Sequence, residues 1–355
     1  MKIRNLVLAL TVAALPLQAA QVGTTQLSLP VTVSPTNKLV GSFLARPALV
    51  YGQTSGNVSS NSATFTMYGT NNLTTIPGMS QPVSEAGTAE LAPASDNHYI
   101  VEFTSGPYVG LIKQITSFTS NTVTVLGNLP LIGDGTQFTI RKDHTLGSLF
   151  GDGTTNNPLA PCIAAGPSIT SADIVSVLSS SGTWNQYFYQ TAQSGKAGTG
   201  GWRLATNPDQ TRSPFTAGTN RANVRVSLGT GFAFKTANGT KNIFLNGEYR
   251  GTRERVTLDS TRGVVIANPY PVATTLGDLG VATSLRANAT AAFADKVNVL
   301  LGGKYVQYFN NGTGFVSSVN EAVSGNGVTI PSGGAVIITG GANREIVFAP
   351  QYITK

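Results

Sequence analysis

The sequence predicts an all-β fold, and three observations lead to that class. Charged residues form only 11% of the chain, which is less than half of the roughly 25% found in soluble domains. The chain holds 40 glycines and 18 prolines, which suit frequent turns rather than long helices. Between the turns, short segments rich in β-branched and aromatic residues recur about every ten residues, a spacing typical of β-sandwiches.

Residues 1–20 have the features of an export signal. Lys2 and Arg4 precede an apolar run over residues 6–17, and Ala19 and Ala20 offer small residues for cleavage. This order of positive, apolar and small residues is that of a secretory signal peptide. We therefore expect an exported protein, in the periplasm, at the cell surface or outside the cell. No later apolar run reaches the roughly 18 residues of a spanning segment, so no transmembrane helix is expected after signal removal.

The later part of the chain contains an internal repeat. Residues 145–149, 172–178, 184–188, 226–231 and 249 recur, in the same order, as residues 275–279, 294–300, 305–309, 328–333 and 352. Five blocks in one order indicate two copies of one unit. A further segment, residues 31–40, resembles residues 256–265 without a gap. The first copy therefore includes a piece from much earlier in the chain.

The position of that early piece indicates an insertion. In the second copy the equivalent piece leads directly into the next block, whereas in the first copy residues 48–143 intervene. We predict two related β-sandwich-like repeats, residues 31–47 plus 144–255 and residues 256–355. A small β-barrel or sandwich module, residues 48–143, is predicted to be inserted in the first repeat, which is tolerated where the ends of the inserted module lie close together.

Several segments resemble a known group of proteins. They are the signal peptide with residues 99–106, 138–142, 145–150, 201–203 and 268–271. Together they are similar to an uncharacterised family of secreted β-rich proteins from verrucomicrobial-type environmental bacteria. The resemblance implies export and β architecture, and it implies no activity because the family has none assigned.

No residue pattern predicts catalysis, a metal or a cofactor, so a non-enzyme is expected. His98 and His144 are the only histidines. Adjacent strand residues point to opposite faces, so Asp143 would not orient His144 as a general base. Asp173 and Asp295 are repeat equivalents, which favours one structural role used twice over a catalytic pair of carboxylates. Zinc, calcium and nucleophile-elbow motifs are missing from the sequence.

Two interpretations of the aromatic residues stay open. Exposed rings could stack on sugars, and the candidate glycan-stacking residues are Trp184, Tyr187, Trp202, Tyr305 and Tyr308. Equivalent aromatics in both copies are also what a repeated core would require. Because a core ring is buried and a stacking ring is exposed, the burial of Trp184 and Tyr305 separates the two interpretations.

The positive charge of the chain is concentrated in one window. Residues 201–262 hold ten basic residues against four acidic ones. Within it, Arg250, Arg253 and Arg255 are candidate contacts for an anionic partner such as an envelope or extracellular polysaccharide. Nucleic acid is not expected as a partner, because the sequence contains no nucleic-acid recognition motif.

Three functions follow from these observations. The first is a secreted, non-catalytic structural or cell-surface β protein, including a role in the extracellular matrix. The alternative is a carbohydrate- or envelope-binding β-sandwich module, for which the aromatic and basic residues speak. A further alternative is an outer-membrane β-barrel, which the domain-scale repeat disfavours because such barrels repeat at the scale of single strands.

Overall fold

The computed structural model describes residues 26–69, 72–83, 93–192, 200–206, 220–250, 253–258, 260 and 263–348. Strands account for 43% of the chain and helices for 4%, and the strands form several antiparallel sheets. The predicted all-β class is therefore confirmed. The predicted export signal in residues 1–20 lies outside the described residues.

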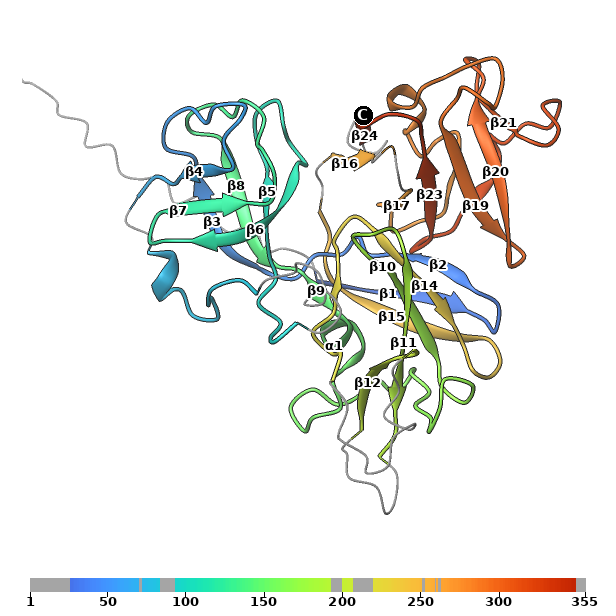
Figure 1. Ribbon diagram of the computed structural model, residues 1–355, viewed down its shortest axis with the longest axis horizontal. Helices are drawn as coiled ribbons and strands as arrows, with labels where there is room; N and C mark the ends of the chain where they lie inside the picture. Colours follow the sequence, from blue (N-terminus) through green and yellow to red (C-terminus); the bar gives the residue numbers. More distant parts are fainter. Residues whose placement is uncertain are drawn as a thin grey trace, which may run out of the picture.

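A five-stranded sheet forms the lower part of the molecule in Figure 1. Its strands are β2 (Lys38–Gly41), β10 (Ile174–Leu178), β11 (Trp184–Gln190), β12 (Gly201–Leu204) and β14 (Gly231–Lys235), in the order β12-β11-β10-β14-β2. A ladder of β1 (Gln26–Val33) and β15 (Lys241–Glu248) shares its hydrophobic core. In β15, Ile243 and Leu245 are buried whereas Phe244 is 47% exposed, so the period of two directs the aliphatic side chains into that core.

A short segment completes this part, which we call the central unit. The strand β9 (His144–Thr145) pairs with β13 (Arg225–Val226) and leads into the helix α1 (Leu146–Phe150). Thr145 caps the helix, because its Oγ1 accepts the N–H of Ser148 at 3.1 Å and the Ser148 hydroxyl accepts the N–H of Thr145 at 2.7 Å. The ring of Phe150 then lies 5.7 Å from Phe232 and 5.9 Å from Trp202, which fixes the helix against the sheet.

A second five-stranded sheet forms the C-terminal unit, at the upper right of Figure 1. Its strands are β17 (Val264–Ala267), β19 (Lys296–Leu301), β20 (Lys304–Asn310), β21 (Phe315–Ser317) and β23 (Ala335–Thr339), in the order β21-β20-β19-β23-β17. Two short ladders accompany it, β16 (Glu254–Leu258) with β24 (Arg344–Phe348) and β18 (Thr274–Thr275) with β22 (Thr329–Ile330). The 3-10 helix η3 (Ala282–Ser284) precedes β19.

The two five-stranded sheets correspond strand by strand. When the five strands of each sheet are numbered along the chain, both sheets have the same strand order, 4-3-2-5-1. The registers agree as well, since Val175 lies opposite Tyr187 in the central unit and Val297 lies opposite Tyr308 in the C-terminal unit. Strand order and register therefore match across two segments about 120 residues apart.

A buried carboxylate is also placed alike in both units. Asp173 and Asp295 are both fully buried. Asp173 immediately precedes β10, and Asp295 immediately precedes β19. Each accepts, through Oδ2, a backbone N–H from nine residues earlier in the chain, at 2.7 and 2.8 Å. Each also pairs with the first residue of the last strand of its unit, Lys241 for Asp173 and Arg344 for Asp295. The two carboxylates thus tie equivalent loops to equivalent strands.

A six-stranded sheet, which we call the lateral module, lies to the left in Figure 1. Its strands are β3 (Ala48–Gln53), β4 (Thr64–Thr66), β5 (Tyr99–Phe103), β6 (Ile112–Phe118), β7 (Thr122–Val125) and β8 (Gln137–Lys142), in the order β3-β8-β5-β6-β7-β4, with the 3-10 helix η1 (Leu73–Thr75) after β4. All of them lie between β2 and β9 in the chain. In β7 the valines are buried and the threonines are half-buried, the pattern of a strand with one covered face.

None of the sheets formed by the described residues closes into a barrel, so the barrel form predicted for residues 48–143 is wrong. The two outer strands of the lateral module, β3 and β4, meet only through an isolated bridge between Thr54 and Met67. Since β4 is three residues long, it is too short to continue a ladder along β3. The sheet therefore stays open at this edge.

The outer face of the central sheet packs against the C-terminal unit. A small apolar cluster joins Leu39 and Ala233 of the central unit to Val265 and Ala335 of the C-terminal unit. The two backbones approach closely here, because a Cβ added to Gly41 would lie 2.6 Å from the Cβ of Ala267. A larger residue at position 41 would force the two units apart.

Candidate functional site

Five charged side chains form a buried group where the three units meet, which we call the junction network. They are Glu102 and Arg141 of the lateral module, Glu248 of the central unit, Arg250 just after it, and Glu254 of the C-terminal unit. Arg250 donates through Nη1 to Glu102 Oε1 at 3.1 Å and through Nη2 to Glu254. Arg141 donates to Glu248 at 2.5 Å. All five side chains are buried, and their ion pairs link the central unit to the lateral module and to the C-terminal unit.

The network contains three carboxylates and two guanidinium groups. Because the acidic groups outnumber the basic ones, the pKa values of its members depend on their neighbours. Burial alone would lower the pKa of Arg250, but the charges of Glu254 and Glu102 outweigh burial and raise it. Burial raises the pKa of Glu254 above its ordinary value, and the nearby charge of Glu102 adds to the rise although Arg250 opposes it. Arg250 therefore stays charged, and Glu254 takes up a proton more readily than an exposed glutamate does.

Arg255 makes a second connection between the lateral module and the C-terminal unit. Its Nε donates to the carbonyl of Val109 at 3.0 Å, and its Nη2 donates to the carbonyl of Pro107 at 2.7 Å. Nη1 pairs with Glu345 of β24 at 2.6 Å. The guanidinium carbon also lies 5.5 Å from the ring centre of Tyr108, within the range of a cation–π contact.

The peptide around Gly110 approaches the C-terminal unit so closely that only glycine fits. A Cβ added to Gly110 would lie 1.6 Å from the carbonyl oxygen of Arg253, and the residue has a φ of +83°. Leu111 forms an isolated parallel bridge with Arg255 at the same place. The contact between the two units therefore involves the backbone as well as the side chains.

The segment that leaves the lateral module is held by Asp143, whose side chain is fully buried. Oδ1 of Asp143 accepts the N–H groups of His144 and Leu228, both at 2.9 Å, and Oδ2 pairs with Arg225 at 2.7 Å. Asp143 thus contacts the backbone of His144 and not its ring, as the sequence predicts. By these contacts, the carboxylate belongs to the central unit.

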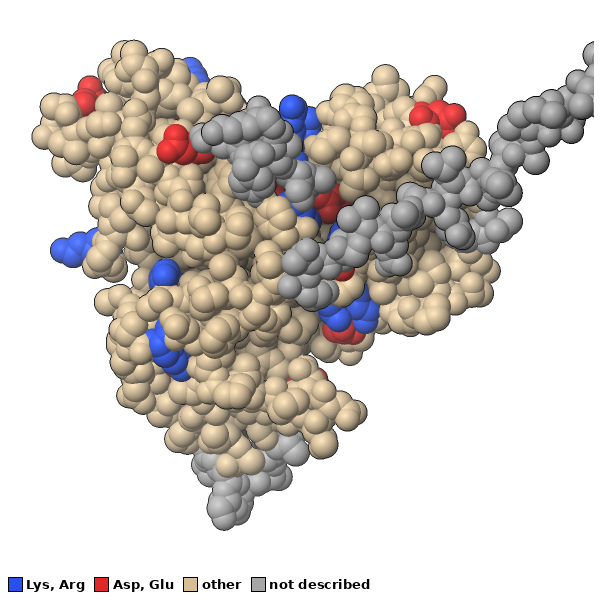
Figure 2. Space-filling view, turned by 180° about the vertical axis from the view of Figure 1, so that it is seen from behind, with Lys and Arg blue, Asp and Glu red and all other residues tan. Residues whose placement is uncertain are grey.

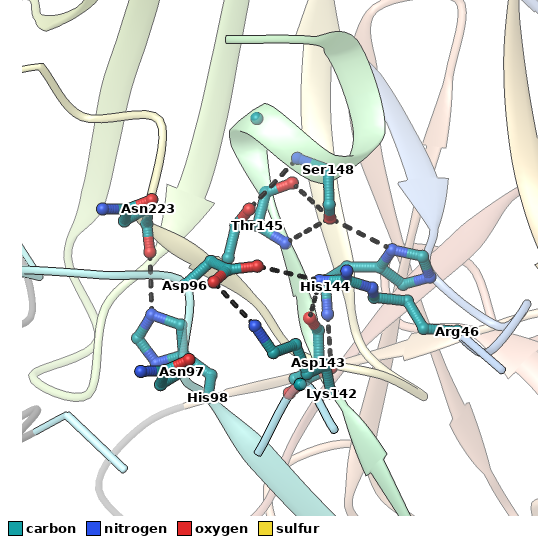
Figure 3. Close-up of polar contacts among 12 residues, drawn as sticks. Arg46, Asp96, Asn97, His98, Lys142, Asp143, His144, Thr145, Ser148 and Asn223 are labelled. Atoms are coloured by element: carbon teal, nitrogen blue, oxygen red, sulfur yellow. Dashed lines mark hydrogen bonds and ion pairs between the residues drawn. The ribbon is translucent and has the colours of Figure 1, made fainter. Parts of the chain in front are cut away.

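Both histidines bond to backbone carbonyls at this junction, and Figure 3 shows the bond between His98 and Asn223. Nε2 of His98 faces the carbonyl of Asn223 at 2.8 Å, and Nε2 of His144 faces the carbonyl of Leu44 at 2.8 Å. Nδ1 of His144 lies 3.4 Å from the Ser148 hydroxyl. With Nε2 protonated, the neutral ring of His144 donates to the carbonyl of Leu44, and its Nδ1 faces the Ser148 hydroxyl, which also donates to the carbonyl of Thr145 at 3.0 Å.

Burial keeps His144 neutral. It lowers the pKa of the imidazole below 6.5, and the nearby charge of Arg46 lowers it further, while Asp143 and the bond to Leu44 oppose the shift. The ring is 4% exposed and both of its nitrogens have partners. This arrangement suits a residue that fixes a junction, since a general base needs access to the proton that it removes.

A cleft of about 670 Å³ opens where the three units meet. The lateral module contributes Gln114 and Thr116, the central unit contributes the hairpin of β10 and β11 with Asn185, and the C-terminal unit contributes Thr257 and the start of β17. Ligand sites often lie at such contacts between domains and have volumes of roughly 300–1,000 Å³. Sequence reasoning did not find this cleft, because its lining residues come from many short segments spread between Pro82 and Val265.

Three of the candidate glycan-stacking residues are buried in the core. Tyr187 is 1% exposed, Tyr308 is 5% exposed and Trp202 is fully buried, with its Nε1 donating to the carbonyl of Gly151 at 2.8 Å. Trp184 is half-buried and packs on the apolar cluster between the central and C-terminal units. Tyr305 is 51% exposed, so it is the only one of the five with a largely free ring.

The candidate anion-contacting arginines are also divided between interior and surface. Arg250 and Arg255 are engaged by the contacts described above, which leaves little of either guanidinium group for an external anion. Arg253 is exposed. Figure 2 shows that acidic and basic residues occupy only small, separate patches of the face seen there. Four of the ten basic residues of the window pair with acidic residues from elsewhere in the chain: Arg225, Lys241, Arg250 and Arg255.

In the part of the chain that the structure describes, no three His, Cys, Asp or Glu side chains are grouped so that they could hold a metal ion. Among the same residues, no helix has the length and apolar character needed to cross a membrane.

No protein-family model matches this chain, and no curated protein or solved structure is significantly similar to it. The family resemblance therefore stays a prediction.

Sequence reasoning also missed the junction network, although its members leave a signal. Glu102 lies within the otherwise apolar strand 99–103, and Arg141 directly follows Ile140 in a strand that also holds Phe138. A charged residue in a strand that is otherwise apolar indicates burial with a partner of opposite charge. That signal identifies members of a network but not their partners, which come from other units.

Proposed function

We propose that this is an exported, non-catalytic structural or cell-surface protein, built from a duplicated β-sandwich-like unit with a β module inserted in the first copy. The matching strand orders, registers and buried carboxylates of the central and C-terminal units support the duplication. Insertion is supported by the place of the lateral module between β2 and β9, and by the pairing of its first and last strands, where Ala48 lies opposite Arg141.

The observation that carries the structural role is the junction network. Breaking a buried ion pair by removing one partner costs roughly 3–5 kcal/mol, so units joined by several such pairs resist independent movement. Arg250 alone contacts carboxylates from two other units. A protein whose units are held in this way keeps a fixed shape outside the cell, where its one cysteine, Cys162, offers no internal disulfide to do so.

The second candidate function is binding of envelope or extracellular polysaccharide. The observation that favours it is the cleft of about 670 Å³ between the three units. A rigid junction would keep such a cleft in one shape, and preorganised sites lose less entropy when a ligand binds. This candidate is compatible with a structural role, because a surface protein can be anchored by the glycan that it binds.

Export and lack of catalysis can be tested together. The full chain and a chain lacking residues 1–20 are expressed in a Gram-negative host, and cells are fractionated and labelled with a membrane-impermeant biotin reagent. We expect the full chain outside the cytoplasm and the shortened chain inside it. The purified full chain is then assayed with chromogenic glycosides and esters. Turnover of either substrate class, or retention of the full chain in the cytoplasm, would contradict the proposal.

A further inference from the structure

We propose that the cleft between the three units binds a neutral oligosaccharide, held through hydroxyl and amide groups rather than through charge. The inference rests on the second candidate function, polysaccharide binding, and names its ligand class and its residues. It replaces the anionic partner expected from the basic window of the sequence.

The charge of the cleft is the first argument. Among the described residues that line it, none is acidic, and Arg225 and His98 are the only two that can carry positive charge. Arg225 pairs with the buried Asp143 at 2.7 Å and donates to Gln114 at 2.7 Å. Its charge is therefore balanced inside the protein. An acidic ligand would lose its hydration without gaining a free cation, which is unfavourable.

The polar groups of the walls are the second argument. Hydroxyl groups come from all three units, with Thr116 from the lateral module, Ser179 and Ser180 from the central unit and Thr257 from the C-terminal unit. The amide of Asn185 lies among them. A hydroxyl offers one donor and two acceptor positions, so Thr116 can bond a ligand although it also donates to the carbonyl of Thr124 at 3.3 Å. Sugar hydroxyls, which both donate and accept, match such walls.

A local irregularity places one of these hydroxyls. The pairing of β6 with β7 shifts register between Ile115 and Ser117, so Thr116 lies at a β-bulge. Bulges are frequent beside functional sites, where they redirect a side chain from its regular position. Thr116 is exposed and lines the cleft, as expected for a residue displaced toward a ligand.

Apolar side chains in the cleft complete the match to a sugar. Val177, Leu178 and Val264 form part of the walls, and Leu126, which is 61% exposed, lies beside them. The C–H faces of a sugar ring can cover such surface and remove it from water. A purely apolar ligand fits less well, because it would leave the hydroxyl groups of the walls without partners.

The test is native affinity electrophoresis of the full chain in gels that contain one soluble polysaccharide each. The neutral probes are dextran, mixed-linkage β-glucan and galactomannan, and the acidic probes are alginate and polygalacturonate. The cleft variant combines Asn185→Leu with Thr116→Val. The matched control combines Gln186→Leu with Ser117→Ala, which changes the next residue on each of the same strands, outside the cleft.

We expect at least one neutral probe to slow the wild-type protein and the control variant equally. The cleft variant should lose roughly tenfold or more in association constant, equivalent to about 1.4 kcal/mol. Thermal unfolding checks that each variant is folded. If the double cleft variant does not fold, the single variant Thr257→Val is tested instead. Thr257 lines the cleft and is exposed, so its replacement should leave the fold intact.

The remaining outcomes separate two failures. Retardation by the acidic probes alone would overturn the neutral ligand and leave polysaccharide binding intact. No retardation by any probe would overturn both the inference and the second candidate function. Equal retardation of the cleft and control variants by a neutral probe would place the binding site outside the cleft and overturn the inference.

Discussion

His144 shows how the junction sets the protonation state of a single residue. Burial lowers the pKa of its imidazole below the ordinary value of 6.5. In the unfolded chain the ring takes up a proton near pH 6.5, whereas in the folded protein it does so only at lower pH. The contribution of His144 to stability is therefore present above about pH 6.5 and is lost as the pH falls below it.

Replacement of His144 by Gln should flatten this pH dependence. Glutamine can still donate to the carbonyl of Leu44 but cannot titrate. Between about pH 7.5 and pH 5.5, we expect the wild-type protein to lose up to roughly 1.4 kcal/mol of unfolding free energy per pH unit more than the variant does. Urea unfolding at a series of pH values measures this difference. Parallel curves for wild type and His144→Gln would contradict the assignment.

The aromatic residues of β11 and β20 separate into core and surface positions. Tyr187→Ala and Tyr308→Ala remove buried rings and should each cost roughly 3–5 kcal/mol. Tyr305→Ala removes a ring that is 51% exposed and should cost less than about 1 kcal/mol. Chemical unfolding of the three variants tests this order. A large loss for Tyr305→Ala, comparable to that for Tyr308→Ala, would show that its ring belongs to the core.

The sequence predicts these strands correctly but not which of their faces is covered. Trp184 and Tyr305 occupy the same register position, opposite Leu178 and Leu300. Nevertheless Trp184 packs between the two units, while Tyr305 is largely exposed. The period of two identifies two faces, and only the position of the neighbouring unit decides which face is buried. A single sequence contains no local signal for that position.

At the scale of elements, the loops before β10 and β19 provide a direct test of equivalence. Asp173→Asn and Asp295→Asn each remove a charge that bonds a backbone N–H and pairs with a cation. Each should lower the unfolding free energy by about 2–3 kcal/mol, the usual value of hydrogen bonds to charged groups. The loss should be the larger at Asp173, because its Oδ1 also accepts the N–H of Ala237 at 2.9 Å. Denaturant unfolding measures both, and a loss at one position only would contradict a shared structural role.

The elements also show where sequence reasoning stops. Strand segments and the expected interruption between β2 and β9 follow from short patterns that repeat along the chain. The junction network and the cleft do not, because Glu102 and Arg250 are 148 residues apart and no repeat relates them. Pairings between units depend on how whole sheets pack, which no local pattern records.

At the scale of the whole molecule, the lateral module should be removable. Its first and last strands pair at Ala48 and Arg141, so a short glycine linker can replace residues 48–142 while Asp143 keeps its bonds. We expect the shortened protein to unfold cooperatively, at a lower temperature than the full chain because Glu248 and Arg250 lose partners from the module. Differential scanning calorimetry measures this. A shortened protein without a cooperative transition would contradict an inserted module.

The central claim, that the junction network unites the three units, is tested most directly by differential scanning calorimetry of the full chain and of Arg250→Met. The account predicts one transition for the wild type, with calorimetric and van't Hoff enthalpies equal, as in a two-state protein. Removal of the guanidinium takes a buried cation away from Glu102 and Glu254, so the variant should lose roughly 3–5 kcal/mol and unfold in separate steps. Separate transitions in the wild type, or an unchanged single transition in Arg250→Met, would contradict the account.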